Sequence, residues 1–182
     1  MLYRSEASPI PLISLQEIKT HLRLDHALED EYLQNLIQGA TEWVEHEIGR
    51  ALLYQTWVNV HQPNECTFEQ QATISIDLEY PPLVEIVSIE ALLADGAKKP
   101  IRRYVLNTNN LMPRLSLGYQ HHPIAITYRC GYGERPITVP PTLRQAVLTV
   151  ATKFYEDRSQ NTELKTPLLQ SLLNPFRVMR IR

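Results

Sequence analysis

The segment of this sequence that comes nearest to a phosphate-binding loop follows a short apolar run. It reads RCGYGERPITVPPTLRQAV from Arg129 to Val147, so that two glycines stand between a strand-like run and a helix-like one. A P-loop requires G-x-x-x-x-G-K-[ST], in which backbone N–H groups and a lysine contact the phosphates. Here Glu134 follows the second glycine, Gly133, and places a negative charge there, and Pro136 lacks an N–H.

The start of the following helix is equally unsuited to an anion. Pro140 and Pro141 remove two N–H donors from the position where an anion would bind. The dinucleotide fingerprint fails as well, because GYGERP has a proline where the third glycine belongs. We therefore interpret the glycines as a sharp exit from a sheet, with Pro141 suited to the first helical position.

Metal-ligating residues are present without a metal-binding spacing. The histidines are His21, His26, His46, His61, His121 and His122, and the cysteines are Cys66 and Cys130. None of them forms H-E-x-x-H or a C-x-x-C zinc pattern. Two cysteines are too few for a disulfide framework, so we expect reduced thiols.

Hydrolytic chemistry finds no support either. There is no G-x-S-x-G elbow, and the acidic cluster Glu29, Asp30 and Glu31 is better explained as the first turn of a helix. Trp43 and Trp57 lie within apolar patterns and are expected to pack in the core. We predict no catalytic, cofactor-binding or metal-binding residues and no cofactor.

A basic bias near the C-terminus keeps DNA binding as an alternative. It comes from Arg144, Lys153, Arg158, Lys165, Arg177, Arg180 and Arg182. No reading motif accompanies these residues, and the pI of about 6.3 argues against a surface built throughout for DNA.

Charge is unevenly distributed along the 182 residues. Residues 1–61 hold 4 Lys/Arg and 9 Asp/Glu, whereas residues 129–182 hold 9 and 4, although the net charge is only -2. This polarity can be neutralised within one fold, between neighbouring copies, or by nucleic acid. The sequence has no signal-peptide pattern and no apolar run long enough for a bilayer, so we expect a cytoplasmic start and no membrane partner.

Helical periodicity marks both ends of the chain. Ser14 opens a capping box before a helix at 15–24, and a second helix begins near the acidic cluster and ends at Gly49. A third helix follows Pro141, and a short fourth one, capped by Thr166, stops before Pro175.

Between these helices the period changes to two. Strands are predicted in YQTWVNV, TISIDL, VEIVSIEALL, RYVLN and IAITYR, with a hairpin turn at Asp95-Gly96. The segments QPNECTFEQQ and NTNNLMPRLSLGYQHHP are predicted as loops, the second long enough to be a contact arm.

The predicted fold class is α+β. A helical core of about four helices, from residues 12–50 and 138–174, carries an inserted antiparallel β lobe at about 54–130. Residues 1–182 would form a single domain with a C-terminal tail at 175–182.

This order of motifs resembles the head-tail connector, or adaptor, proteins of long-tailed phages, in the longer form with a β insertion. The resemblance extends from about Ile13 to Arg158 and returns at LLNPFRV; it is loose between 62 and 123. Its most specific parts are the L-R-L-D turn at residues 22–25, the W-V-E…Q-T-W run at 43–57 and the G-Y-G…L-R-Q-A run at 131–146.

The resemblance implies a non-enzymatic virion protein at the head–tail interface, assembled in the host bacterial cytoplasm. Such proteins form a ring, expected to be dodecameric, under the portal protein. They extend the DNA channel, through which DNA passes without sequence-specific binding, and they dock the tail completion or stopper protein. Relatives occur in prophages and gene transfer agents.

Two further expectations concern assembly. The acidic N-terminal helices and the basic C-terminal region would meet across subunits of the ring, because a heterologous interface needs complementary faces. The tail FRVMRIR, or the polar link before the last helix, would become ordered on the portal protein.

Overall fold

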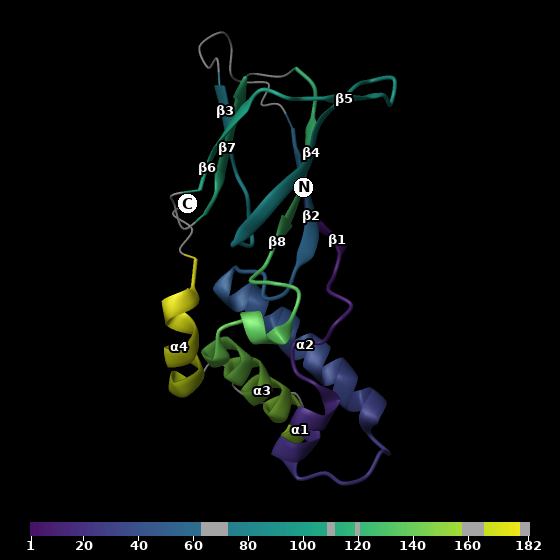
Figure 1. The fold of residues 1–182 in the computed structure, drawn as a ribbon, viewed down its shortest axis with the longest axis vertical. Coiled ribbons are helices and arrows are strands. Elements are labelled where there is room, and N and C mark those ends of the chain that lie inside the picture. The colour runs from purple at the N-terminus through teal and green to yellow at the C-terminus, as the bar shows by residue number, and fades with distance from the viewer. Residues whose placement is uncertain (63–72, 109–111, 119–120, 158–165, 179–182) are drawn as a thin grey trace. The chain divides into compact units, whose positions relative to one another are not determined.

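The computed structural model describes residues 1–62, 73–108, 112–118, 121–157 and 166–178. The chain divides into two compact units, one of strands and one of helices. The first comprises Met1–Ala7 and Tyr54–Gly131, and the second comprises Ser8–Leu53 and Tyr132–Arg182 (Figure 1). The predicted α+β class, with four helices from the two ends of the chain and an antiparallel β lobe, is confirmed.

The helical unit contains four α-helices and two 3-10 turns in its described part. They are α1 (Leu15–Leu22), α2 (Asp30–Ile48), η1 (Pro136–Thr138), α3 (Pro141–Glu156), α4 (Pro167–Leu173) and η2 (Asn174–Phe176).

The helices begin and end largely where the sequence predicts, with two differences from the predicted caps and ends. Ser14 accepts a hydrogen bond from the Glu17 N–H at 3.1 Å, and Gly49 ends α2 with φ 68°. Helix α1 is shorter than expected, because Arg23 takes a left-handed conformation (φ 58°). Thr166 occupies the N-cap position of α4 but makes no side-chain cap bond.

The core of the helical unit lies along one stripe of each long helix. From α2 it takes Leu33, Ile37, Ala40, Val44 and Ile48, and from α3 it takes Leu143, Ala146, Val147, Val150 and Ala151. These positions follow the three-four spacing by which one face of a helix becomes apolar. Trp43 packs at the edge of this core, as expected.

The β unit contains two antiparallel sheets. The five-stranded sheet has the order β1-β2-β8-β4-β5 and the three-stranded sheet has the order β3-β7-β6. The strands are β1 (Leu2–Glu6), β2 (Gln55–His61), β3 (Thr73–Asp77), β4 (Leu83–Leu92), β5 (Lys98–Pro100), β6 (Tyr104–Asn107), β7 (Arg114–Gly118) and β8 (Ile124–Cys130).

All five predicted strands form, and three more accompany them. The expectation that 107–123 is a single contact arm is wrong, since β7 lies within it as the central strand of its sheet, with Leu115 and Leu117 buried. The segment QPNECTFEQQ lies, apart from Gln62, outside the described residues.

The hairpin predicted at Asp95-Gly96 joins β4 to β5. Gly96 has φ 84°, the Leu93 N–H donates to the Ala97 carbonyl at 2.9 Å, and the Asp95 carboxylate accepts from the Ala97 N–H at 2.9 Å. The returning strand β5 begins at Lys98, before the predicted strand RYVLN, so the hairpin is tighter than the sequence pattern predicts.

Candidate functional site

The glycine segment is where the chain passes from the β unit to the helical unit. Strand β8 ends at Cys130, Gly131 takes φ 127°, and α3 begins at Pro141. A Cβ on Gly133 would lie 2.3 to 2.8 Å from three side-chain atoms of Thr138. Glycine is therefore required there by a close approach within the turn and not by a ligand.

Two N–H groups at the start of this segment are hydrogen-bonded to carbonyls of the same chain. The Gly131 N–H donates to the Pro82 carbonyl at 2.9 Å and the Tyr132 N–H to the Leu52 carbonyl at 3.1 Å. The Thr138 hydroxyl donates to the Arg135 carbonyl at 2.6 Å. The segment has the hydrogen bonding of a structural junction, which is the interpretation that the sequence favours over a phosphate loop.

Within the described residues, no three His, Cys, Asp or Glu side chains lie close enough together to hold a metal ion. Cys130 is buried and its thiol is directed at the Gln55 carbonyl, 3.9 Å away, whereas Cys66 lies outside the described part. A search of the described helices for a membrane-spanning segment finds no candidate.

Trp57 does not lie fully in the core as expected. It is half-buried on β2, and its ring stacks on that of Tyr80 with centroids 4.2 Å apart. Tyr128, by contrast, is fully buried on β8 and donates to the Glu79 carbonyl at 3.1 Å. Burial raises the pKa of this phenol above its ordinary value, with a smaller contribution from nearby acidic groups.

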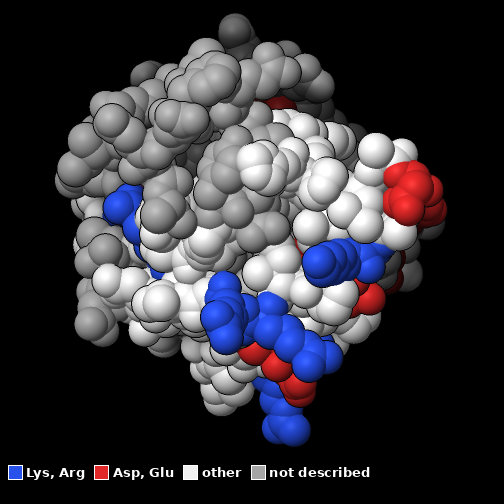
Figure 2. Space-filling model, turned by 90° about the horizontal axis from the view of Figure 1, so that it is seen from above, with Lys and Arg blue, Asp and Glu red and all other residues white. Residues whose placement is uncertain are grey.

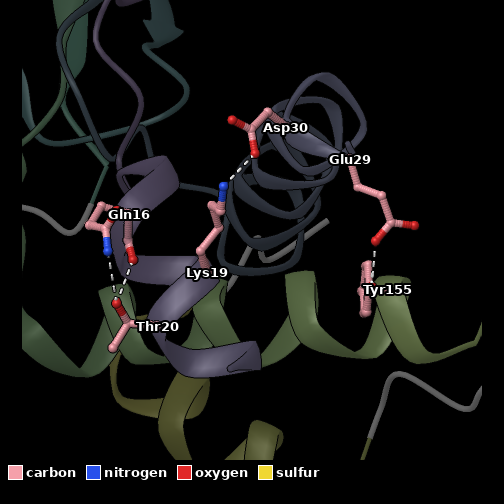
Figure 3. A network of polar contacts seen from close by, with 6 residues as sticks. All are labelled: Gln16, Lys19, Thr20, Glu29, Asp30 and Tyr155. Atoms are coloured by element: carbon pink, nitrogen blue, oxygen red, sulfur yellow. Dashed lines mark hydrogen bonds and ion pairs between the residues drawn. The ribbon is translucent and has the colours of Figure 1, made fainter. Parts of the chain in front are cut away.

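The acidic start of α2 is bonded to the other helices of its own unit (Figure 3). Lys19 of α1 contacts Asp30 at 2.7 Å, and the Tyr155 hydroxyl of α3 donates to Glu29 at 2.6 Å. The acidic cluster lies at the start of α2, as expected, and two of its three carboxylates have partners from α1 and α3.

Two basic residues of the C-terminal region, Arg144 and Arg177, are paired within the helical unit. The Arg144 guanidinium donates from Nη2 to both carboxylate oxygens of Glu17, at 2.9 and 3.1 Å. Glu17 thus completes an ion pair between α1 and α3 instead of the reciprocal half of the predicted capping box.

The chain after α4 returns to the C-terminal end of α2. Arg177 pairs with the Glu47 carboxylate, and its Nε donates to the Glu47 carbonyl at 3.2 Å. The Val178 N–H donates to the Ile48 carbonyl at 2.9 Å, and the Arg50 Nε donates to the Phe176 carbonyl at 2.5 Å.

These pairs neutralise part of the charge of the two chain ends within one chain. The expectation that the acidic and basic ends also meet across subunits stays a prediction. Arg144 and Arg177 neutralise Glu17 and Glu47 within one chain, because the two chain ends form one helical unit. The tail is likewise attached to α2 as far as Val178, and residues 179–182 lie outside the described part.

A second group of basic residues lies in the β unit, away from the basic C-terminal region. The stretch KKPIRR, residues 98–103, places four exposed cations in and after β5: Lys98, Lys99, Arg102 and Arg103. Only Lys98 has an ion pair among the described residues, with Glu90 at 3.6 Å. Figure 2 shows several Lys and Arg side chains in the lower part of the face that it presents, with Asp and Glu side chains beside some of them. The signal, four cations in six residues, is visible in the sequence.

Known proteins match this chain both in sequence and in fold. The sequence model of the family described as Phage gp6-like head-tail connector protein matches residues 12–85. A search of curated proteins gives no match.

Solved structures match over the full length. A chain in the neck of an empty GTA particle computed with C6 symmetry has a TM-score of 0.83 at 20% identity, and the match covers 100% of this chain and 97% of that one. A chain in the virion of a native gene transfer agent particle has a TM-score of 0.81 at 21% identity, with the same coverage. A chain in the neck of a native GTA particle computed with C12 symmetry has a TM-score of 0.77 at 21% identity, again with the same coverage.

At this level of identity the structural likeness concerns the fold. The resemblance noted from the sequence motifs is confirmed by the family match: residues 12–85 match the head-tail connector family, and the whole chain has the fold of these neck chains.

Proposed function

We propose that this protein is a structural connector of a phage-like virion and that it acts at the junction of head and tail. The observation that carries the proposal is the full-length fold match to chains of a particle neck, joined to the connector-family match at residues 12–85. The hydrogen bonding of the glycine segment supports a structural role, because its amides bind carbonyls of the same chain.

In the proposed role the chain assembles as a ring of twelve under the portal protein. The ring extends the DNA channel and offers the tail completion or stopper protein a surface on which to dock. The C6 and C12 symmetries of the related necks support a ring of this order. Assembly takes place in the bacterial cytoplasm, and the protein leaves the cell as part of the virion.

The charge of the chain suits a channel through which DNA must move. DNA held by many phosphate contacts would bind tightly and release poorly at low salt. The net charge of -2 and the internal pairing of Arg144 and Arg177 leave little basic surface on the described helical unit for such binding. Passage without sequence-specific binding is consistent with both features.

The same pairs weaken the alternative of a DNA-binding module that uses the C-terminal region. Of its seven basic residues, Arg144 and Arg177 are bound to carboxylates, and Arg158, Lys165, Arg180 and Arg182 lie outside the described residues. A gel shift of the full-length protein with duplex DNA separates the two functions. Tight, salt-dependent retardation at micromolar protein would favour the alternative.

A complementation experiment tests the proposal itself. Deletion of the gene in a particle-producing strain should leave DNA-filled heads and free tails that do not join. Addition of the purified protein to the extract should restore joined particles, and addition of a heat-denatured sample should not. Joined particles at normal number in the deletion strain would contradict the proposal.

A further inference from the structure

Exposed apolar side chains of the β unit gather on two strands. Seven large apolar residues in the described part of this unit are exposed, and five of them lie on β4 or β6: Val84, Val87, Tyr104, Val105 and Leu106. Monomeric proteins seldom expose neighbouring apolar residues along a strand unless another surface covers them.

Among the described residues, strand β6 has a strand partner along one edge only. It is the outer strand of the order β3-β7-β6, and all four of its residues are exposed, Val105 to 69%. An edge strand of this kind presents unpaired N–H and C=O groups beside apolar side chains. Arg102 and Arg103, which directly precede it, are exposed and have no ion pair or hydrogen bond to a described residue.

The first half of β4 has an open edge of its own. Strand β5 pairs with Glu90, Ala91 and Leu92, and the Ile101 N–H donates to the Ile89 carbonyl at 2.8 Å. Residues 83–88 of β4 have a strand partner on the β8 side alone in the described part. The register of β4 against β8 shifts at Val84 and again at Val87. A residue at such a bulge is left unpaired and its side chain is redirected, which accounts for the exposure of these two valines.

Strand β5 is the outer strand of the five-stranded sheet, and its residues protect that edge from pairing with another chain. Its three residues are Lys98, Lys99 and Pro100, all exposed. Lysine and proline on an edge oppose pairing with another chain. Neither device is present within β6 or at residues 83–88 of β4, where the exposed side chains are mainly apolar.

From this contrast we propose that β6 of one copy docks against the open edge of β4, residues 83–88, in the next copy. Val105 and its neighbours would cover Val84 and Val87. Arg102 and Arg103 would approach Glu85, whose carboxylate is 53% exposed and otherwise contacts only Arg129, at 3.1 Å, among described residues.

A second copy is the occupant that the two surfaces identify. They are different surfaces on the same chain, one apolar with excess basic charge and the other apolar with an exposed carboxylate. Contact between two different surfaces is heterologous, and repetition of a heterologous contact closes into a ring when its rotation allows. The inference thus rests on the proposed function and names the contact that would build its ring.

Thiol crosslinking in assembled particles tests this contact. Cys66→Ser removes the thiol outside the described part, and Cys130 is buried. Val105→Cys and Val87→Cys are then introduced together and treated with a short bismaleimide, which tolerates small differences in register. We expect a ladder of crosslinked species from dimer upward on a denaturing gel.

The single-cysteine variants are the matched controls. Neither Val105→Cys nor Val87→Cys alone should give more than monomer, because a heterologous contact never brings the same position together twice. A dimer from Val105→Cys alone would mean that β6 pairs with β6, and a doubly modified monomer would mean a contact within one chain. Either result would overturn the inference.

Charge reversal gives a second, independent readout. Arg102→Glu with Arg103→Glu should reduce the number of joined particles at least tenfold, and Glu85→Lys added to this variant should restore part of the loss. Arg23→Glu with Arg135→Glu makes the same charge change at two exposed arginines of the helical unit and should have little effect.

The two claims fail in distinguishable ways. Particles that contain the protein at their neck but give no ladder, with all variants joining normally, would refute the β6–β4 contact and leave the proposed function intact. Particles without the protein would refute the proposed function and the contact with it. Circular dichroism of each purified variant establishes that it is folded.

Discussion

Single residues in this protein show which sequence features are structural. Gly133 lies in the segment that resembles a phosphate loop, but the space beside it is filled by Thr138. Gly39, near the middle of α2, has no atom within 4 Å of the position of a Cβ. The two glycines thus allow a direct comparison of a required glycine with a dispensable one.

We expect Gly133→Ala to lower the free energy of unfolding by about 1 to 3 kcal/mol, because overpacking forces the turn to shift. Gly39→Ala should raise the free energy of unfolding by up to about 1 kcal/mol, since alanine is the better helix former. Thermal and urea unfolding measure both. Thr138→Gly in the Gly133→Ala background should recover part of the lost free energy of unfolding. Equal stability of the wild type, Gly133→Ala and this double variant would contradict the close approach of Gly133 to Thr138.

Tyr128 gives a prediction about alkaline pH. Burial raises the pKa of its phenol in the folded state, whereas in the unfolded chain the same phenol has a pKa of about 10. The folded state therefore keeps a proton that the unfolded state loses, so stability is full below about pH 10 and falls as the pH rises further. Urea unfolding between pH 8 and 11 should show this decline, and Tyr128→Phe should make it shallower. The same slope in the variant would assign the decline to other groups.

The Glu17–Arg144 pair joins α1 to α3 at the surface of the helical unit. Its side chains are 37% and 29% exposed, so solvent screens the pair. We expect Glu17→Gln to cost about 0.5 to 1 kcal/mol, in the range of partly exposed pairs. A double-mutant cycle with Arg144→Leu measures the coupling, which should shrink at high salt. A coupling of zero at low salt would mean that the pair has no energetic role.

At the scale of elements, the sequence predicts the helices better than the strands. Helices α2 and α3 have long apolar stripes and clear end signals at Gly49 and Pro141, so their positions follow from local rules. The missed strands have weaker signals. Strand β5 consists of Lys98, Lys99 and Pro100, which have no preference for strands, and forms because the Asp95-Gly96 turn brings it beside β4.

Strand β7 was missed for a different reason. Its five residues follow Pro113 and end at Gly118, and only Leu115 and Leu117 mark the buried face. A pattern so short is indistinguishable from a loop until its neighbours β3 and β6 are known. Ion pairs such as Arg177 with Glu47 join residues far apart in the sequence, and no local pattern predicts them.

The tail is an element whose proposed role can now be tested more sharply. Residues 176–178 hold the end of α2 through backbone and side-chain contacts, so truncation before Asn174 would disturb the helical unit as well as any portal contact. Removal of residues 179–182 alone avoids this. If the tail binds the portal protein, this shorter variant should keep its melting temperature within a few degrees and join far fewer heads to tails. Normal joining would argue against a portal role for these four residues.

The whole molecule combines two units with different tasks in the proposed connector. The helical unit pairs several of its charges internally, whereas Lys99, Arg102 and Arg103 of the β unit have no ion pair with a described residue. We therefore propose a subunit contact through the β unit, whereas contact between the acidic and basic ends stays a separate prediction. The resemblance of the motifs identified the family, but only the fold shows which charges remain available.

The central claim is that this chain forms the connector ring of a virion neck, and electron cryo-microscopy of particles from the producing strain tests it most directly. The account predicts a ring of twelve copies between the portal protein and the tail, with density into which both units of this chain fit and a central passage for DNA. A neck in which that position is filled by another protein, with this chain absent from the particle, would contradict it.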